Sequence, residues 1–151
     1  MILKRKGMQV LREWRQNPGR KSLIVSGARQ TGKTFLIRLF AKEYYDALYE
    51  LNFLEDRSLK DVFSGALDAD TILTNLRLFF PQTSYSPGKT LLFLDEVQEC
   101  PEAITALKFL SGDPRFDVVA SGSALGMAYK QVSSFPVGYV EYYDMFALDF
   151  E

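Results

Sequence analysis

The sequence contains no histidine and a single cysteine, Cys100, among its 151 residues. The absence of histidine excludes a Ser-His-Asp triad, a histidine general base and a histidine-ligated metal site within this sequence. One cysteine cannot form an internal disulfide, so a reducing, cytoplasmic compartment is expected. The sequence has no run of about 20 apolar residues that could span a membrane. Residues 1–6 lack the apolar core of a signal peptide, and no membrane partner is expected.

What is present is typical of one globular domain. The chain is 47% hydrophobic and 25% charged. A chain of this length buries about 68–70% of its unfolded surface, which is enough for a substantial core. No internal repeat or low-complexity segment is visible.

Residues 27–34 form a phosphate-binding motif. They fit G-x-x-x-x-G-K-[ST], the P-loop or Walker A motif. The residues are Gly27, Ala28, Arg29, Gln30, Thr31, Gly32, Lys33 and Thr34. The apolar run 23–25 before the motif is typical of a buried strand, and residues 35–42 after it are typical of a helix. Because this motif requires a strand, a glycine-containing loop and a helix in that order, we expect nucleotide phosphates to bind here.

The chemistry of this loop follows from its backbone. Gly27 and Gly32 can adopt conformations closed to residues with a Cβ, so successive N–H groups can point toward one phosphate. The following helix adds its unpaired N–H groups and the positive end of its dipole. Lys33 is expected to contact the β- and γ-phosphates, and the Thr34 hydroxyl is expected to bind Mg²⁺.

Charge is distributed unevenly along the chain. Residues 1–42 hold 11 Lys and Arg against the single acid Glu13, a net charge of +10, whereas residues 43–151 carry a net charge of −11. A basic segment can indicate nucleic-acid binding. The alternative is that it serves bound phosphates and complements the acidic remainder. We favour this alternative because Arg29 and Lys33 already belong to the phosphate-binding loop.

The remaining pattern predicts alternating strands and helices. Strands are expected at residues 47–52, 90–94, 116–120 and 139–147, and helices at residues 59–63, 72–80 and 101–110. This alternation predicts an α/β fold with a parallel sheet covered on both faces. Ligands in such sheets bind at the carboxyl ends of the strands. Three motifs lie at such ends: the P-loop, Asp95-Glu96, and Ser121-Gly122-Ser123.

An amphipathic helix is expected before the first strand. It places apolar residues at helical spacing and stops at residues 17–19; they are Leu3, Val10, Leu11 and Trp14. We expect it to pack on the sheet edge. Trp14 and Arg5 either approach the adenine of a nucleotide or are ordinary core and surface residues.

Asp95 and Glu96 end the apolar strand predicted at residues 90–94. Two acids at the end of a buried strand are costly unless a cation or hydrogen bonds satisfy them. Asp95 fits the carboxylate that phosphoryl transfer needs near Mg²⁺, and Glu96 fits a general base for the attacking water. The alternative is a solvated turn. Gln98 either holds the water, contacts the γ-phosphate or is an ordinary loop residue.

Small hydroxyl side chains follow the strand predicted at residues 116–120. Ser121 and Ser123 are candidate γ-phosphate sensors, and an ordinary turn is the alternative. We assign Ser123 to the catalytic set together with Lys33 and Glu96.

The three motifs together resemble those of the prokaryotic AAA-superfamily P-loop ATPases that carry a C-terminal domain of unknown function. The likeness covers about residues 20–150. It rests on Arg29-Gln30 inside the P-loop, Gln98 two positions after the Walker B acids, and Gly122-Ser123 ending the sensor strand. The resemblance implies ATP as the nucleotide and Glu96 as the water-activating residue. It also implies a three-layer α/β/α P-loop NTPase fold of the additional-strand type, with a five-stranded, mostly parallel sheet of order 5-1-4-3-2. Ser121 or Ser123 would then lie beside the γ-phosphate.

Members of that family continue past the fifth strand into further domains, whereas this sequence ends at Glu151. We therefore expect an ATPase core over residues 1–151, with an N-terminal helix and linker at 1–19 and a nucleotide-binding domain at 20–151. Lid and effector domains would be absent, and with them the usual source of a second-sensor arginine. Arg29 and Arg115 are candidates to contact phosphates or a neighbour's nucleotide, although Arg115 also fits an ordinary surface arginine.

The leading hypothesis is Mg²⁺-dependent ATP hydrolysis. The alternative is a nucleotide-dependent switch, or a nucleic-acid-associated regulator with little turnover of its own. A small-molecule kinase is disfavoured because residues 120–136 carry only Lys130 as a basic residue, and a GTPase because no Asn-Lys-x-Asp motif is present. Expected partners are ATP and ADP. Self-association, a protein partner and nucleic acid stay open.

Overall fold

The computed structural model describes residues 2–27, 32–82, 84–123, 138 and 140–145, with side chains from residue 6 onward. Within these residues no helix combines the length and the apolar character needed to cross a membrane.

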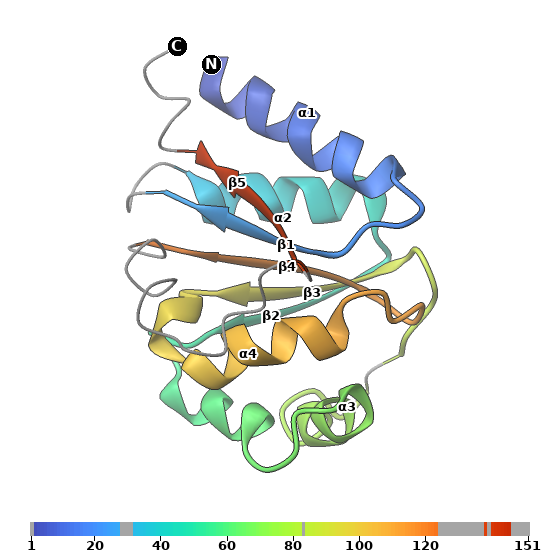
Figure 1. The fold of residues 1–151 in the computed structure, drawn as a ribbon, viewed down its shortest axis with the longest axis vertical. Helices are drawn as coiled ribbons and strands as arrows, with labels where there is room; N and C mark the ends of the chain where they lie inside the picture. Colours follow the sequence, from blue (N-terminus) through green and yellow to red (C-terminus); the bar gives the residue numbers. More distant parts are fainter. Residues whose placement is uncertain (1, 28–31, 83, 124–137, 139, 146–151) are drawn as a thin grey trace.

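A five-stranded parallel sheet forms the centre of the molecule (Figure 1). Its strands are β1 (Ser22–Ser26), β2 (Ala47–Asn52), β3 (Thr90–Asp95), β4 (Asp117–Gly122) and β5 (Val140–Asp144). They lie in the order β2-β3-β4-β1-β5, and every neighbouring pair is parallel. This arrangement confirms the predicted α/β class and the order 5-1-4-3-2. It also brings the carboxyl ends of β1, β3 and β4 to one edge of the sheet.

Helices cover both faces of this sheet (Figure 1). They are α1 (Ile2–Gln16), α2 (Lys33–Tyr44), α3 (Ala69–Leu76) and α4 (Pro101–Leu110), with the short 3₁₀ helices η1 (Arg57–Phe63) and η2 (Val97–Glu99). The side chains of β3 alternate between the two faces. Leu91 and Phe93 pack with α1 and α2, whereas Leu92 and Leu94 pack with η1, α3 and α4. A strand buried on both faces explains the continuous apolar run in the sequence.

Two predicted helices differ from the observed ones. The helix expected at residues 72–80 is observed as Ala69–Leu76. It begins at Ala69 because the Asp68 carboxylate caps it by accepting a hydrogen bond from Thr71 N at 3.0 Å. The helix expected at residues 59–63 is observed as the 3₁₀ helix η1. Helix α1 packs on the face of the sheet that α2 also covers, near the edge strand β5 (Figure 1). The strand expected at residues 139–147 is observed as Val140–Asp144, and residues 139, 146 and 147 lie outside the described residues.

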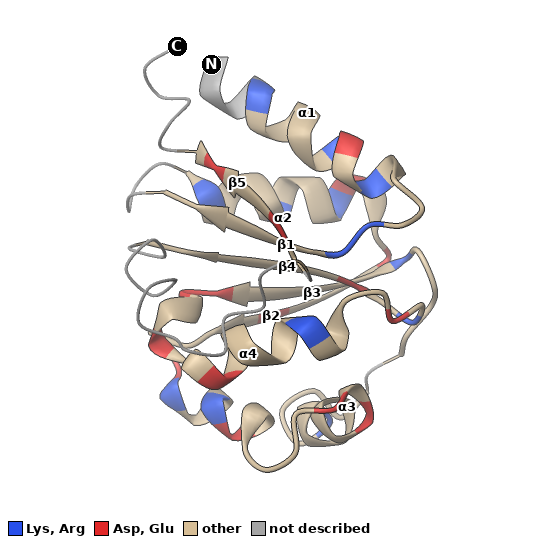
Figure 2. Cartoon of the chain, in the orientation of Figure 1, with Lys and Arg blue, Asp and Glu red and all other residues tan. Residues whose placement is uncertain are grey.

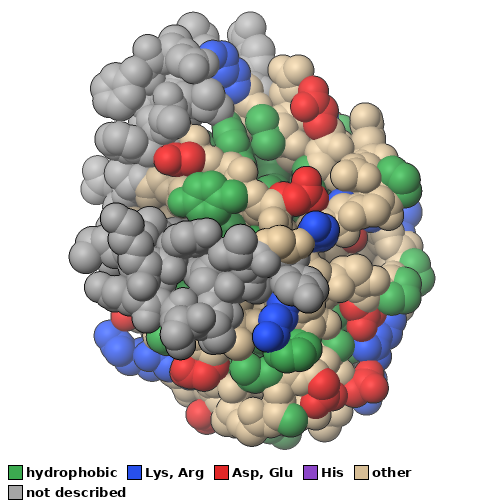
Figure 3. All heavy atoms as spheres, viewed as in Figure 1, with side chains coloured by type: hydrophobic (Ala, Val, Ile, Leu, Met, Phe, Trp, Pro, Cys, Tyr) green, Lys and Arg blue, Asp and Glu red, His purple; other side chains and the backbone are tan. Residues whose placement is uncertain are grey.

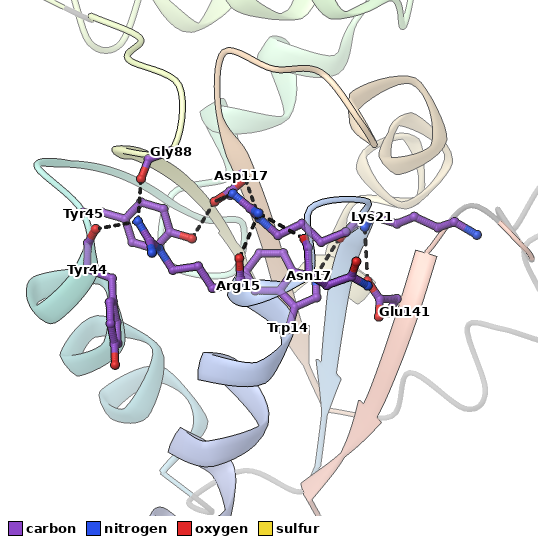
Figure 4. A network of polar contacts seen from close by, with 10 residues as sticks. Trp14, Arg15, Asn17, Lys21, Tyr44, Tyr45, Gly88, Asp117 and Glu141 are labelled. Carbon is purple, nitrogen blue, oxygen red and sulfur yellow. Dashed lines mark hydrogen bonds and ion pairs between the residues drawn. The ribbon is translucent and has the colours of Figure 1, made fainter.

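Trp14 is a core residue. Its side chain is buried, and its Nε1 donates a hydrogen bond to Lys21 O at 2.8 Å, at the amino end of β1 (Figure 4). Gly27 follows the opposite end of that strand. The adenine role considered for Trp14 is therefore wrong. The Arg5 side chain lies outside the described residues.

Asp117 anchors a polar network at the same amino-end edge (Figure 4). Its carboxylate accepts hydrogen bonds from Arg20 Nε at 3.0 Å, Arg20 Nη2 at 2.9 Å and Tyr45 OH at 2.6 Å. Burial and the hydrogen bond to Asp117 raise the pKa of Tyr45 far above its usual range. The network ties the α1–β1 connection and the end of α2 to the start of β4.

Ion pairs link the basic start of the chain to its acidic remainder. They are Arg12–Glu43, Arg20–Asp117 and Arg38–Glu50. Lys and Arg concentrate on α1 and on the segment leading into β1 (Figure 2), and on the face in Figure 3 side chains of both signs lie interspersed. These ion pairs are expected if the basic segment complements the acidic remainder of the chain.

Replacing Tyr45 with Phe tests the contribution of this network to stability. The substitution removes a hydrogen bond to a charged acceptor, so we expect the free energy of unfolding to fall by about 1.5–3 kcal/mol at pH 7. Tyr142→Phe is the control, because the half-exposed Tyr142 hydroxyl bonds the neutral Ser26 Oγ. Its expected loss is under about 1 kcal/mol. Equal losses in urea denaturation would contradict the role of Asp117.

The stability difference between wild type and Tyr45→Phe should depend on pH. Above about pH 10 Tyr45 ionises in the unfolded chain but stays protonated in the folded one. The unfolded state then binds fewer protons, so this contribution to stability is present below pH 10 and is lost as the pH rises. The difference between wild type and Tyr45→Phe should narrow between pH 8 and pH 10.5. A constant or growing difference would contradict the assignment.

Candidate nucleotide-binding site

The described part of the P-loop connects β1 to α2. Gly27 follows β1, and Gly32 stands directly before α2 with φ +84°, a left-handed conformation that favours glycine. Leu36 N donates to Gly32 O at 2.9 Å, which starts the helix at once. The strand before the motif and the helix after it are therefore both observed, as the motif requires. The predicted phosphate contacts of Ala28, Arg29, Gln30 and Thr31 fall on residues outside the described part of the chain.

Lys33 is buried although it carries an ammonium group. The residue is 7% exposed, and its Nζ donates a hydrogen bond to Gly27 O at 2.9 Å. This bond reaches from the first residue of α2 back to the start of the loop. A buried ammonium needs polar partners, and here it lies where the motif predicts a phosphate.

The Asp95 carboxylate is the centre of the site. The residue is 3% exposed. Oδ2 accepts hydrogen bonds from Thr34 Oγ1 at 2.8 Å and Asn52 Nδ2 at 3.5 Å. Oδ1 accepts from Ser121 Oγ at 2.7 Å and Glu96 N at 2.9 Å. The structure thus joins the hydroxyl of the P-loop to the first acid after β3, as the two motifs predict together.

The donor set at Thr34 and Asp95 fits Mg²⁺. Mg²⁺ prefers oxygen ligands and is usually held by one or two protein groups plus phosphate oxygens and water. A hydroxyl and a carboxylate 2.8 Å apart meet that description. The described residues contain no cluster of three or more His, Cys, Asp or Glu side chains that could hold a metal ion without a phosphate.

Glu96 occupies a left-handed turn directly after β3. Its φ of +55° is positive, which is unique among the described residues other than glycine. For a residue with a Cβ this conformation costs about 1–2 kcal/mol. Its Oε1 accepts a hydrogen bond from Gln98 Nε2 at 2.9 Å. Backbone strain of this kind collects at functional sites. Gln98 contacts Glu96 and is therefore not an uninvolved loop residue.

Two site residues have roles that the sequence did not specify. The sequence pattern places Asn52 in a strand and assigns it no further role, but it ends β2 directly opposite Asp95 in the register of the sheet. A polar residue at the carboxyl end of a neighbouring strand was the available signal. Ser121 is fully buried, and its hydroxyl is committed to Asp95. Ser123 follows β4 and is partly exposed, and its catalytic assignment stays a prediction.

Arg115 lies away from this site. It precedes β4 and pairs with Asp113 at 2.7 Å and with Asp70 at 2.9 Å. Its hydrogen bonds hold the pKa of the Asp113 carboxyl below its usual range. Because the amino end of β4 is the opposite edge from the P-loop, contact with phosphates at this chain's own loop is excluded for Arg115.

Comparison with known proteins agrees with this geometry. The family model described as AAA domain matches residues 19–151. No curated protein matches the chain. Among solved structures, C. elegans PCH-2 is similar, with a TM-score of 0.59 and 13% sequence identity over 96% of this chain. This chain spans 42% of the PCH-2 chain, and at that identity the likeness concerns the fold alone.

The two serines after β4 provide a matched test of the Asp95 cluster. Ser121→Ala removes a donor to a buried carboxylate, so we expect the free energy of unfolding to fall by about 1.5–3 kcal/mol. Ser123→Ala should change it by less than about 0.5 kcal/mol, since Ser123 is partly exposed. Chemical denaturation of the nucleotide-free variants measures both values. The cluster would be contradicted if Ser121→Ala were as stable as wild type.

Proposed function

The chain belongs to the AAA domain family, and from that premise we propose that it binds ATP with Mg²⁺ and hydrolyses it to ADP and phosphate. The observation that carries this proposal is the hydrogen bond between Thr34 Oγ1 and Asp95 Oδ2. It joins the end of the phosphate-binding loop to the acid-terminated strand, which are the two halves of a phosphoryl-transfer site.

Binding relies on the loop and on α2. The N–H groups of the first turn of α2 point toward the loop, and the dipole of the helix favours negative charge at that end. Lys33 adds an ammonium that is already held inside the loop by Gly27 O. Such prior ordering lowers the entropy that is lost when a nucleotide binds.

Thr34 and Asp95 would hold the metal ion. When bound, Mg²⁺ neutralises charge on the β- and γ-phosphates. The hydrogen bonds of Asp95 to Ser121 and to Glu96 N keep its carboxylate in place for this role.

Glu96 would act on the attacking water. Its carboxylate takes a proton as the water oxygen bonds to the γ-phosphorus and the bond from that phosphorus to the bridging oxygen breaks. The left-handed turn at Glu96 and the hydrogen bond from Gln98 support this role, because both restrict where the carboxylate can lie.

Removing the Lys33 ammonium tests nucleotide binding. We expect Lys33→Ala to weaken ATP affinity by about 10- to 100-fold, the equivalent of one charge-assisted hydrogen bond. Lys42→Ala is the control, since Lys42 is exposed in the last turn of the same helix. Calorimetric titration gives both affinities. An unchanged affinity in Lys33→Ala would refute the P-loop assignment.

Removing the Glu96 carboxylate tests hydrolysis. Glu96→Gln should reduce phosphate release by at least about 100-fold, the usual contribution of a general base, while ATP affinity is retained. Glu99→Gln, in the neighbouring turn, should retain turnover, since Glu99 pairs loosely with Arg57 at 3.9 Å. Normal turnover in Glu96→Gln would show that Glu96 is not the base. Tight binding without phosphate release in wild type would instead favour a nucleotide-dependent switch.

A further inference from the structure

We propose that Gln98 is the positioning residue for Glu96, and that Gly122 at the end of β4 provides the space that the Gln98 side chain needs. This inference rests on the proposed function, because it takes Glu96 as the base. It assigns a role to a residue that contacts the reacting groups only through Glu96.

Glu96 determines the orientation of the Gln98 amide, that is, which end of it carries the nitrogen. Gln98 Nε2 donates to Glu96 Oε1 at 2.9 Å. At the other end of the amide, Gln98 Oε1 is buried and has no hydrogen-bond partner among the described residues. Reversing the amide would place an oxygen against the Glu96 carboxylate, so that two acceptors would face each other. The amide is therefore held in one orientation.

This arrangement does not serve the stability of the fold. A buried acceptor without a donor costs stability, and an apolar side chain of the same length would avoid that cost. Gln98 keeps one polar end unpaired while its other end holds Glu96. Glu96 in turn sits in a strained left-handed turn. Both costs fall on the same pair of residues, which is typical of groups kept for chemistry.

Gly122 explains how Gln98 fits into this position. A Cβ on residue 122 would overlap Gln98 Oε1, lie 3.3 Å from Gln98 Cδ and lie 3.4 Å from Val97 N. A side chain at this position would therefore have to displace the end of the Gln98 amide, whereas glycine leaves the amide where it contacts Glu96. The Gln98 amide occupies the space that a side chain on residue 122 would take. The amide therefore packs directly against the backbone at the end of β4. Because β4 also supplies Ser121 to Asp95, both acids are positioned from the same strand end.

Steady-state kinetics separate positioning from binding. We expect Gln98→Met, which keeps the length but removes the donor, to lower kcat at least about tenfold and to leave ATP affinity within about twofold of wild type. In a Glu96→Gln background the same substitution should cause no further loss, because Gln98 acts through Glu96. Gln9→Met is the control: Gln9 Nε2 also bonds a glutamate, Glu13, but on the exposed face of α1. That variant should retain wild-type kcat.

These results distinguish failure of the inference from failure of the proposed function. If Glu96→Gln keeps normal turnover, the assignment of the base is wrong. If Glu96→Gln is inactive but Gln98→Met retains wild-type kcat, the base is supported and the positioning role of Gln98 is refuted. A loss of ATP affinity in Gln98→Met would also refute it, since Gln98 would then act on the nucleotide directly.

Thermal unfolding of the nucleotide-free protein tests the steric relation without any activity. Gly122→Ala should lower Tm by about 3–6 °C in the wild-type background. In a Gln98→Ala background the same change should shift Tm by less than about 1 °C, because the overlapping side chain is gone. Equal shifts in both backgrounds would show that Gln98 does not occupy this space. Gln98→Met should leave Tm unchanged or raise it, and a marked fall would indicate a structural role instead.

Discussion

The burial of one carboxylate, that of Asp95, determines how the site is assembled. An ionised carboxylate in a protein interior is costly unless hydrogen bonds or a cation compensate it. The donors come from three different elements and from the turn itself: Thr34 on α2, Asn52 on β2, Ser121 on β4, and the backbone N–H of Glu96. They converge only because β3 lies between β2 and β4 and because all these strands end at the same edge. The order of the strands thus determines which donors can reach the Asp95 carboxylate.

The two ends of the strands differ in how their polar residues are paired and in backbone strain. At the amino-end edge, both oxygens of the Asp117 carboxylate accept hydrogen bonds from Arg20 and Tyr45, and the network links three segments of the chain. At the carboxyl-end edge, Glu96 has a strained backbone and Gln98 keeps an unpaired amide oxygen. Among the described residues other than glycine, a left-handed backbone occurs at Glu96 alone, and strain of this kind collects at functional sites. This contrast supports placing the reaction at the P-loop edge.

Much of this architecture could be predicted from the sequence. The P-loop and the acid-terminated strand each imply a fixed structural context, so the proximity of Thr34 and Asp95 followed from two local patterns, and the strand order followed from the resemblance. Trp14 and Arg115 were harder, because amphipathic spacing shows that a residue is buried or exposed but not at which end of the sheet it lies. The relation of Gln98 to Gly122 could not be foreseen, since it depends on how closely η2 packs against β4.

We propose that Thr34 and Asp95 together form the metal-dependent half of an ATP site. The most direct test of this proposal is calorimetric titration of wild type and Asp95→Asn with ATP, with and without Mg²⁺, after circular dichroism has shown that both are folded. We expect Mg²⁺ to tighten ATP binding to wild type by at least about tenfold, the equivalent of one good charge-assisted contact, and to have little effect on the variant. An equal Mg²⁺ effect in both proteins, or none in wild type, would contradict the proposal.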